Sequence, residues 1–102
     1  MRTRNKSYGD YGITEDEKIY ILDFCRSADE DQKMIIENAL SELNPYIAPY
    51  IYYSLTEGKS YDKMIVKQEI YMSKEDFYGY RRKGMEAIKR YMQLYHIWDR
   101  GV

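Results

Sequence analysis

Apolar residues recur at helical spacing along most of the chain. Between residues 14 and 98 they return at intervals of three, four and seven positions, which places them on one face of a helix. The alternation that marks a half-buried strand occurs only in one short run, QEIYM at residues 68–72. We therefore expect an all-α domain of four to five helices in which the last helix is long.

Two helix-start signals occur in the first half of the chain. Thr14 is followed three residues later by Glu17, and this capping-box pattern predicts a helix up to about residue 26. Ser27 and Glu30 repeat the pattern and predict a second helix, which Asn44-Pro45 should end. The apolar stripe of this second helix consists of Met34, Ile35, Ala39, Leu40 and Leu43.

The third helix is predicted from its prolines and its glycine. Pro49 suits the first turn of a helix, so the helix should begin near Ala48 and run to Glu57, with Gly58 as its stop. Tyrosines crowd this stretch, and they fit either a surface that stacks nucleic-acid bases or a core with hydroxyls at its rim. The helical spacing favours the core for Tyr46, Tyr50, Tyr52 and Tyr53.

The last part of the chain predicts a short helix, a turn and a long helix. Ser60 can cap the short helix, which points Met64 inward, and Ser73 can cap a helix that runs to about Trp98. A short helix, a tight turn and a longer helix with a basic face form a helix-turn-helix, here at about residues 60–98. One side of the long helix carries Phe77, Gly84, Ile88, Tyr91 and Tyr95, with Met85 and Met92 flanking them.

The segment GKSYDKMIVKQEIYMSKEDFYGYRRKGMEAIKRY resembles the helix-turn-helix in region four of bacterial sigma factors. It is also similar to the ArpU and RinA groups of phage late-gene activators, which share an aromatic segment like FYGYRRK. The resemblance implies a transcription regulator of phage or prophage origin that binds double-stranded DNA, with RNA polymerase as a further partner. The matching positions are Gly58, Ser60, Tyr61, Asp62, Met64, Ile70, Ser73 and Phe77.

The register of the long helix selects the candidate DNA-contacting residues. If Phe77, Gly84 and Ile88 face inward, the start of the helix presents side chains to the major groove. In this interpretation Arg81 or Arg82 reads guanine, and neighbouring side chains contact bases, sugar or phosphate. The alternative is a basic helix face that is merely solvated. The candidates are Lys59, Ser60, Lys63, Lys74, Glu75, Tyr78, Arg81, Arg82 and Lys83.

Charge is unevenly distributed along a nearly neutral chain. The sequence has 16 lysines and arginines against 17 aspartates and glutamates, so its overall charge indicates no polyanionic partner. Acids outnumber bases within residues 14–44, however, and bases outnumber acids within residues 59–90. The basic half supports DNA binding. The acidic half supports a second interpretation, a phage-encoded protein-interaction module that acts as an inhibitor or adaptor through residues 14–44.

The remaining composition argues against an enzyme. Cys25 lies among apolar residues and cannot form an intramolecular disulfide, because it is the one cysteine in the chain. His96, the one histidine, is remote from it in sequence, and we expect that ring to pack near Trp98. No metal-ligand spacing, phosphate loop or nucleophile with a base is present, so we expect no catalytic residue, no metal and no cofactor.

Length and flanks suggest one domain preceded by an arm. A chain of 102 residues suits a single modest core, so we assign residues 14–102 to one helical domain and residues 1–13 to a flexible N-terminal arm. No apolar run approaches the length of a membrane span, and no signal-peptide pattern begins the chain. We expect a cytoplasmic protein with no membrane contact. The pattern leaves the oligomeric state open, a homodimer included.

Overall fold

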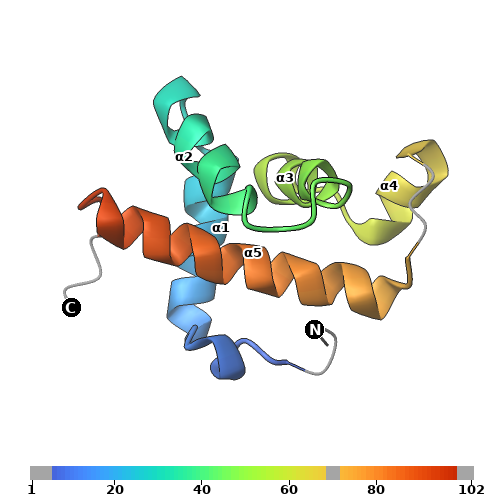
Figure 1. The fold of residues 1–102 in the computed structure, drawn as a ribbon, viewed down its shortest axis with the longest axis horizontal. Helices are drawn as coiled ribbons and strands as arrows, with labels where there is room; N and C mark the ends of the chain where they lie inside the picture. The colour runs from blue at the N-terminus through green and yellow to red at the C-terminus, as the bar shows by residue number, and fades with distance from the viewer. Residues whose placement is uncertain (1–5, 69–71, 99–102) are drawn as a thin grey trace.

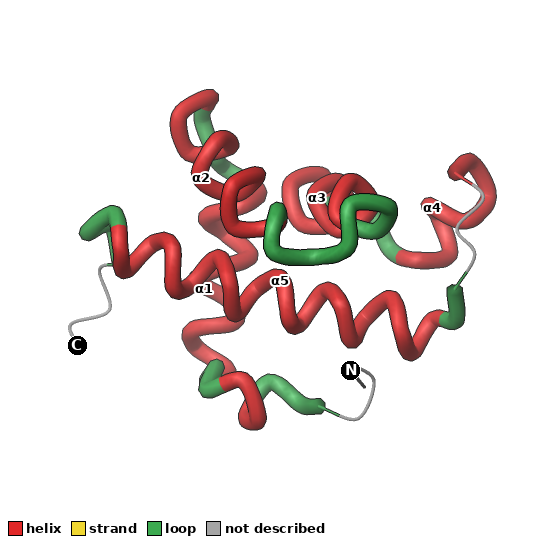
Figure 2. The backbone as a smooth tube through the Cα atoms, in the orientation of Figure 1, coloured by secondary structure: helices red, strands yellow, loops and turns green. Residues whose placement is uncertain are grey.

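The computed structural model describes residues 6–68 and 72–98, and for residues 65–68 it describes the backbone alone (Figure 1). Within this part of the chain it contains five α-helices, one short 3-10 helix and no strand (Figure 2). The expected all-α fold is therefore confirmed. Most of the QEIYM run, including Ile70, lies outside the described side chains.

The first two helices differ in how well their starts were predicted. Helix α1, Glu15–Arg26, has the complete capping box of Thr14 and Glu17 that the sequence predicts. Helix α2, Glu30–Leu40, is capped instead by Asp29. The carboxylate of Asp29 accepts from the backbone N–H of Gln32 at 2.8 Å. The side-chain oxygen of Gln32 in turn accepts from the backbone N–H of Asp29 at 2.9 Å. The predicted cap, Ser27, ends α1 by donating its hydroxyl to the carbonyl of Asp23.

Helices α3, α4 and α5 follow the predicted order. Helix α3 spans Ala48–Glu57 and ends at Gly58, whose φ of 68° is the left-handed conformation that glycine adopts without strain. Helix α4 spans Tyr61–Gln68, and α5 spans Lys74–Leu94. The last helix ends before the predicted Trp98, because His96 has a φ of 61° that interrupts the helical backbone.

Helix α5 crosses the middle of the molecule and packs on every other helix (Figure 1). Phe77 and Ile88 are fully buried, which confirms the predicted register near the start of the helix. At Gly84, helix α5 lies too close to α2 for a larger residue: a Cβ atom there would lie 2.7 Å from Cδ2 of Leu40 on α2. Tyr95 does not join the core as predicted, because it follows the end of α5 and is 47% exposed.

The apolar stripe of α2 is also shifted from the prediction. Ile36, Ala39 and Leu40 are its buried residues, whereas Met34 is 61% exposed. The helix starts later than predicted, at the Asp29 cap, and α5 then covers its C-terminal half (Figure 1). A stripe read from sequence gives the face of a helix, but the neighbouring element decides how far along that face the contact extends.

Residues 6–13, named here the N-terminal segment, are packed rather than loose. Ile13 is 3% exposed, and the hydroxyl of Tyr8 lies 3.7 Å from the sulfur of Met85 on α5. The ammonium of Lys89 donates to the carbonyl of Gly12 at 2.9 Å. The expectation of a flexible arm therefore fails for this segment, because its tyrosines and its isoleucine find apolar surface on the central helix.

No helix among the described residues is both long enough and apolar enough to cross a membrane.

Candidate nucleic-acid interface

Tyr61 fixes α4 against α5 at one end of the molecule. Its ring is 9% exposed and lies 5.4 Å from the ring of Phe77. Its hydroxyl donates to the carbonyl of Met72 at 2.6 Å, and its backbone N–H donates to the hydroxyl of Tyr78 at 3.2 Å. We call this region, residues 59–64 together with residues 72–82, the α4–α5 corner.

Both helices begin at this corner, as their capping residues predict. The hydroxyl of Ser73 accepts from the backbone N–H of Asp76 at 3.1 Å and caps α5. The hydroxyl of Ser60 accepts from the backbone N–H of Lys63 at 3.4 Å at the start of α4. The positive ends of two helix dipoles therefore lie at one end of the molecule, where they favour an anionic ligand.

Three of the predicted contact residues lie exposed at the corner. They are Lys63, Lys74 and Glu75. The ammonium of Lys74 lies 3.4 Å from a carboxylate oxygen of Asp62, so α5 and α4 meet through an exposed ion pair. Such a pair contributes little to stability and can be exchanged for another anion.

Lys59 also lies at the corner and is half-buried, with its ammonium 3.2 Å from a carboxylate oxygen of Glu57. Lys74 and Glu75 share a shallow, open hollow of about 390 Å³ with Tyr78 and Arg82. The corner is thus mixed in charge, and Lys59 and Lys74 each lie beside a carboxylate.

Arg81 is directed into the fold and does not belong to the exposed face. Its Nε donates to the hydroxyl of Ser54 at 3.1 Å, and Ser54 is 1% exposed. The same hydroxyl donates to the carbonyl of Lys59 at 2.7 Å, so Arg81 joins α5 to the C-terminal end of α3. The prediction of an outward Arg81 is wrong because it follows Phe77 by four residues and therefore shares its face of the helix.

Tyr78 and Arg82 are both half-buried and have structural contacts. The Tyr78 hydroxyl accepts the Tyr61 N–H, and its ring packs edge-on against Phe77 at 5.3 Å. Arg82 donates from Nε to the carbonyl of Lys6 at 2.7 Å, and its guanidinium lies 5.9 Å from the centre of the Tyr8 ring. The N-terminal segment therefore covers part of the face that the sequence assigns to DNA.

The charge of Lys83 acts on Glu42, which follows α2. The pKa of Glu42, which follows α2, lies below its usual value mainly because Arg90 donates a hydrogen bond to its carboxylate, and the charge of Lys83 adds a smaller effect. Because the Nε of Arg81 is bonded to the buried Ser54, the nine predicted contact residues do not all belong to one exposed surface.

Cys25 is isolated from any group that could activate it. The thiol is 1% exposed, and its burial raises its pKa to about 12, with only a small opposing effect from the charge of Arg81. A thiol with this pKa is protonated at neutral pH and is a poor nucleophile. In the described part of the chain, no group of three or more histidine, cysteine, aspartate and glutamate side chains is placed to hold a metal ion.

Sequence reasoning missed the contact between Lys6 and Arg82. The carbonyl of Lys6 holds Arg82, and its ammonium lies 5.6 Å from the centre of the Tyr11 ring. The available signal was the cluster of Tyr8, Tyr11 and Ile13, which is unusually apolar for a solvated arm.

Comparison with known proteins found no matching family model, no matching curated protein and no matching solved structure.

Proposed function

We propose that this protein is a sequence-specific DNA-binding transcription regulator that contacts duplex DNA with the α4–α5 corner. The observation that carries the proposal is the joint placement of two helix N-termini and the exposed Lys63 and Lys74 at one end of the molecule. Helix N-termini and lysines are the groups that hold DNA phosphates. The resemblance to sigma region four and to phage late-gene activators gives the regulatory role, with RNA polymerase as a further partner.

The roles of the contact residues follow from their exposure. Lys59, Ser60 and Lys63 precede or begin α4 and bind phosphates, while Lys74 and Glu75 in the first turn of α5 approach base edges. Arg82 lies further along α5, beside the N-terminal segment, where its Nε donates to the carbonyl of Lys6. It reaches the groove from that position. Arg81 takes no part, because its Nε is held by the hydroxyl of Ser54, which is buried.

The experiment is a salt titration of binding to selected and random duplexes. If the three lysines at the corner each neutralise one phosphate, the logarithm of the affinity should fall against the logarithm of salt concentration with a slope of about −3. Lys63→Ala should reduce that slope by about one unit on every sequence. A selection from random duplexes then gives the preferred site.

The matched control is Lys33→Ala. Lys33 also forms an ion pair with a carboxylate, Glu30 at 3.7 Å, but it lies on α2 and outside the corner. It should leave both the affinity and the slope unchanged. No binding of the parent protein to any duplex at about 50 mM salt would contradict the proposal, because phosphate contacts are strong under that condition.

A further inference from the structure

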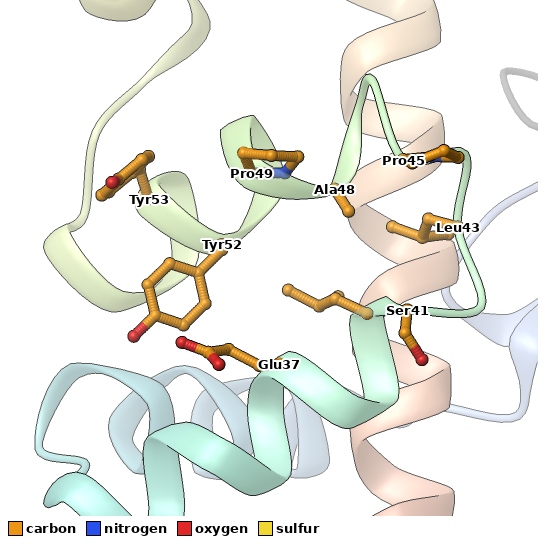
Figure 3. A pocket seen from close by; sticks show the side chains of 9 residues that line it. Glu37, Ser41, Leu43, Pro45, Ala48, Pro49, Tyr52 and Tyr53 are labelled. Carbon is orange, nitrogen blue, oxygen red and sulfur yellow. The ribbon is translucent and has the colours of Figure 1, made fainter.

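A preformed pocket lies between α2 and α3, away from the α4–α5 corner. It has a volume of about 450 Å³, within the range of sites that hold small ligands or side chains. Figure 3 shows its walls: Ala48 and Pro49 at the start of α3, Pro45 in the preceding turn, and Glu37 on α2. None of the nine candidate DNA-contacting residues lines it.

The apolar part of the pocket is built from core leucines and prolines. Leu40 and Leu43 line it and also belong to the core, where they are 2% and 4% exposed. Pro45 and Pro49 have fixed φ angles and no backbone N–H, so their side of the pocket offers apolar contact without a donor. An aliphatic side chain could therefore enter without ordering the pocket, which removes one of the usual costs of binding.

The other part of the pocket carries one carboxylate, that of Glu37. The hydroxyl of Tyr52 points toward the carboxylate of Glu37 across the opening (Figure 3). The pKa of Tyr52 is raised, mainly by burial and then by the charges of Glu37 and Glu30, with a smaller effect from Glu57. Lys33 pairs with Glu30 at the start of α2. A ligand cation at this end of the pocket would therefore lie near the negative charge of Glu37 and the ring of Tyr52.

Exposed aromatic side chains adjoin the pocket. Tyr46 follows the lining residue Pro45 and is 84% exposed, and Tyr53, itself a lining residue, is 42% exposed. Tyrosine is enriched where proteins meet other proteins, because it supplies a large contact area at a low cost in conformational entropy. These rings extend the apolar surface beyond the volume of the pocket.

We infer that this pocket docks a peptide segment of another protein in which an aliphatic residue neighbours a lysine or arginine. The aliphatic side chain occupies the space between Leu40, Pro45 and Pro49, and the cation lies at the Glu37 and Tyr52 end. This function is independent of DNA binding, because the two surfaces share no residue.

The test titrates the ¹⁵N-labelled full chain with three blocked hexapeptides and follows its amide resonances. The first peptide is Ser-Leu-Arg-Ile-Arg-Ser, the second replaces both arginines with glutamate, and the third replaces both aliphatic residues with glycine. At up to about 1 mM, where weak peptide ligands bind, the first peptide should shift amides within residues 37–53 saturably. The other two should shift them at least about tenfold more weakly.

Three variants locate the site. Glu37→Arg should weaken binding of the first peptide at least about tenfold, and Ala48→Leu should do the same by filling the pocket without changing charge. Asp23→Arg makes the same charge change at an exposed position on α1, so it should leave binding unchanged. The amide spectrum of each free variant checks its fold. Shifts outside the pocket, equal binding of the acidic peptide, or no shift with any peptide would overturn the inference.

Discussion

The hydroxyl of Tyr78 accepts a hydrogen bond from the backbone N–H of Tyr61 at 3.2 Å. Tyr61 is the first residue of α4, so its N–H has no partner within its own helix. A side chain from α5 therefore caps α4 in space. Together with the contacts of the Tyr61 ring with Phe77 and of its hydroxyl with the Met72 carbonyl, this bond positions α4 relative to α5, and with it the lysines at the α4–α5 corner.

Tyr78→Phe should destabilise the fold by about 1 kcal/mol, the usual effect of losing one such hydrogen bond. The phenyl ring keeps its contact with Phe77, so the loss measures the hydroxyl alone. Urea unfolding gives the free energy. Tyr53→Phe removes a hydroxyl from a residue that is 42% exposed and is the matched control, with no expected change. Equal stability of the two variants would show that the contact does not hold α4.

Gly84→Ala should destabilise the protein although alanine is the better helix former. The added methyl group would lie 2.7 Å from Cδ2 of Leu40 and 3.3 Å from Cγ2 of Ile51. Overpacking of a buried contact costs about 1 to 3 kcal/mol, whereas alanine gains about 1 kcal/mol in helix propensity over glycine. We expect a net loss of about 1 kcal/mol in thermal or urea unfolding.

Leu40→Ala tests the cause of that loss. Alone it should cost about 2 to 5 kcal/mol, because it empties a core position. In its presence Gly84→Ala should become neutral or stabilising, since the atom that it strikes is gone. Additive effects of the two changes would mean that α2 and α5 do not approach each other at Gly84.

Glu17 should make stability depend on pH in the acid range. Its carboxylate accepts from the backbone N–H of Thr14 and lies 3.0 Å from the ammonium of Lys89. The Thr14 bond first, and then Lys89, hold the pKa of Glu17 below its ordinary value of 4.5. A carboxyl whose pKa is lowered by folding stabilises the fold above its unfolded pKa, and this stability is lost as the pH falls through the folded value.

Glu17→Gln should therefore cost about 1 kcal/mol at pH 7, the upper end for a partly exposed ion pair. The amide can keep the capping bond, so the difference from the parent should come from the charge. As the pH falls below about 4.5, the difference should shrink toward zero. Unfolding at several pH values checks this, and a constant difference would assign the loss to capping geometry.

Arg82→Ala and Lys63→Ala should affect DNA binding differently. Arg82→Ala should weaken the preferred site by about 1 to 3 kcal/mol and relax the preference at one base pair, because a guanidinium can grip two acceptors on one guanine. Lys63→Ala should weaken all sequences alike, because an ammonium near phosphate reads no base. Binding assays on the selected site and on its single-base variants distinguish the two outcomes.

Arg82→Ala carries a structural effect that its control must separate. The guanidinium also holds the carbonyl of Lys6, so its loss should loosen the N-terminal segment. Tyr8→Ala disturbs the same segment through its contact with Met85; it also removes the ring that lies 5.9 Å from the Arg82 guanidinium, but it keeps the guanidinium itself. If Tyr8→Ala reproduces the change in base preference, the arginine acts through the segment and does not read DNA itself.

Local chemistry explains what the sequence could predict. Thr14 with Glu17, Pro49 with Gly58, and Ser73 each mark a helix boundary through a backbone bond or a dihedral preference that depends on a few neighbouring residues. Those boundaries were read correctly. Where two local signals compete, as at Ser27 and Asp29, the sequence does not show which one tertiary packing will use.

The site was harder to predict because it depends on contacts between distant residues. Arg81 could have been placed inward from its spacing to Phe77, but its partner Ser54 lies on another helix. The contact of Arg82 with Lys6 spans 76 residues and leaves no periodic signal. The pocket between α2 and α3 likewise depends on how the turn at Pro45 and the first turn of α3 at Pro49 come together with Leu40 of α2.

The central place of α5 has a consequence for biosynthesis. A ribosome makes the chain from its N-terminus, so α1, α2 and α3 emerge while the helix that fills the space between them is still unmade. Ile36, Leu40 and Ile51 must then remain in contact with water, or with a chaperone, until Met85 and Ile88 have left the exit tunnel. We therefore expect the nascent chain to be most exposed to aggregation before α5 has emerged from the exit tunnel.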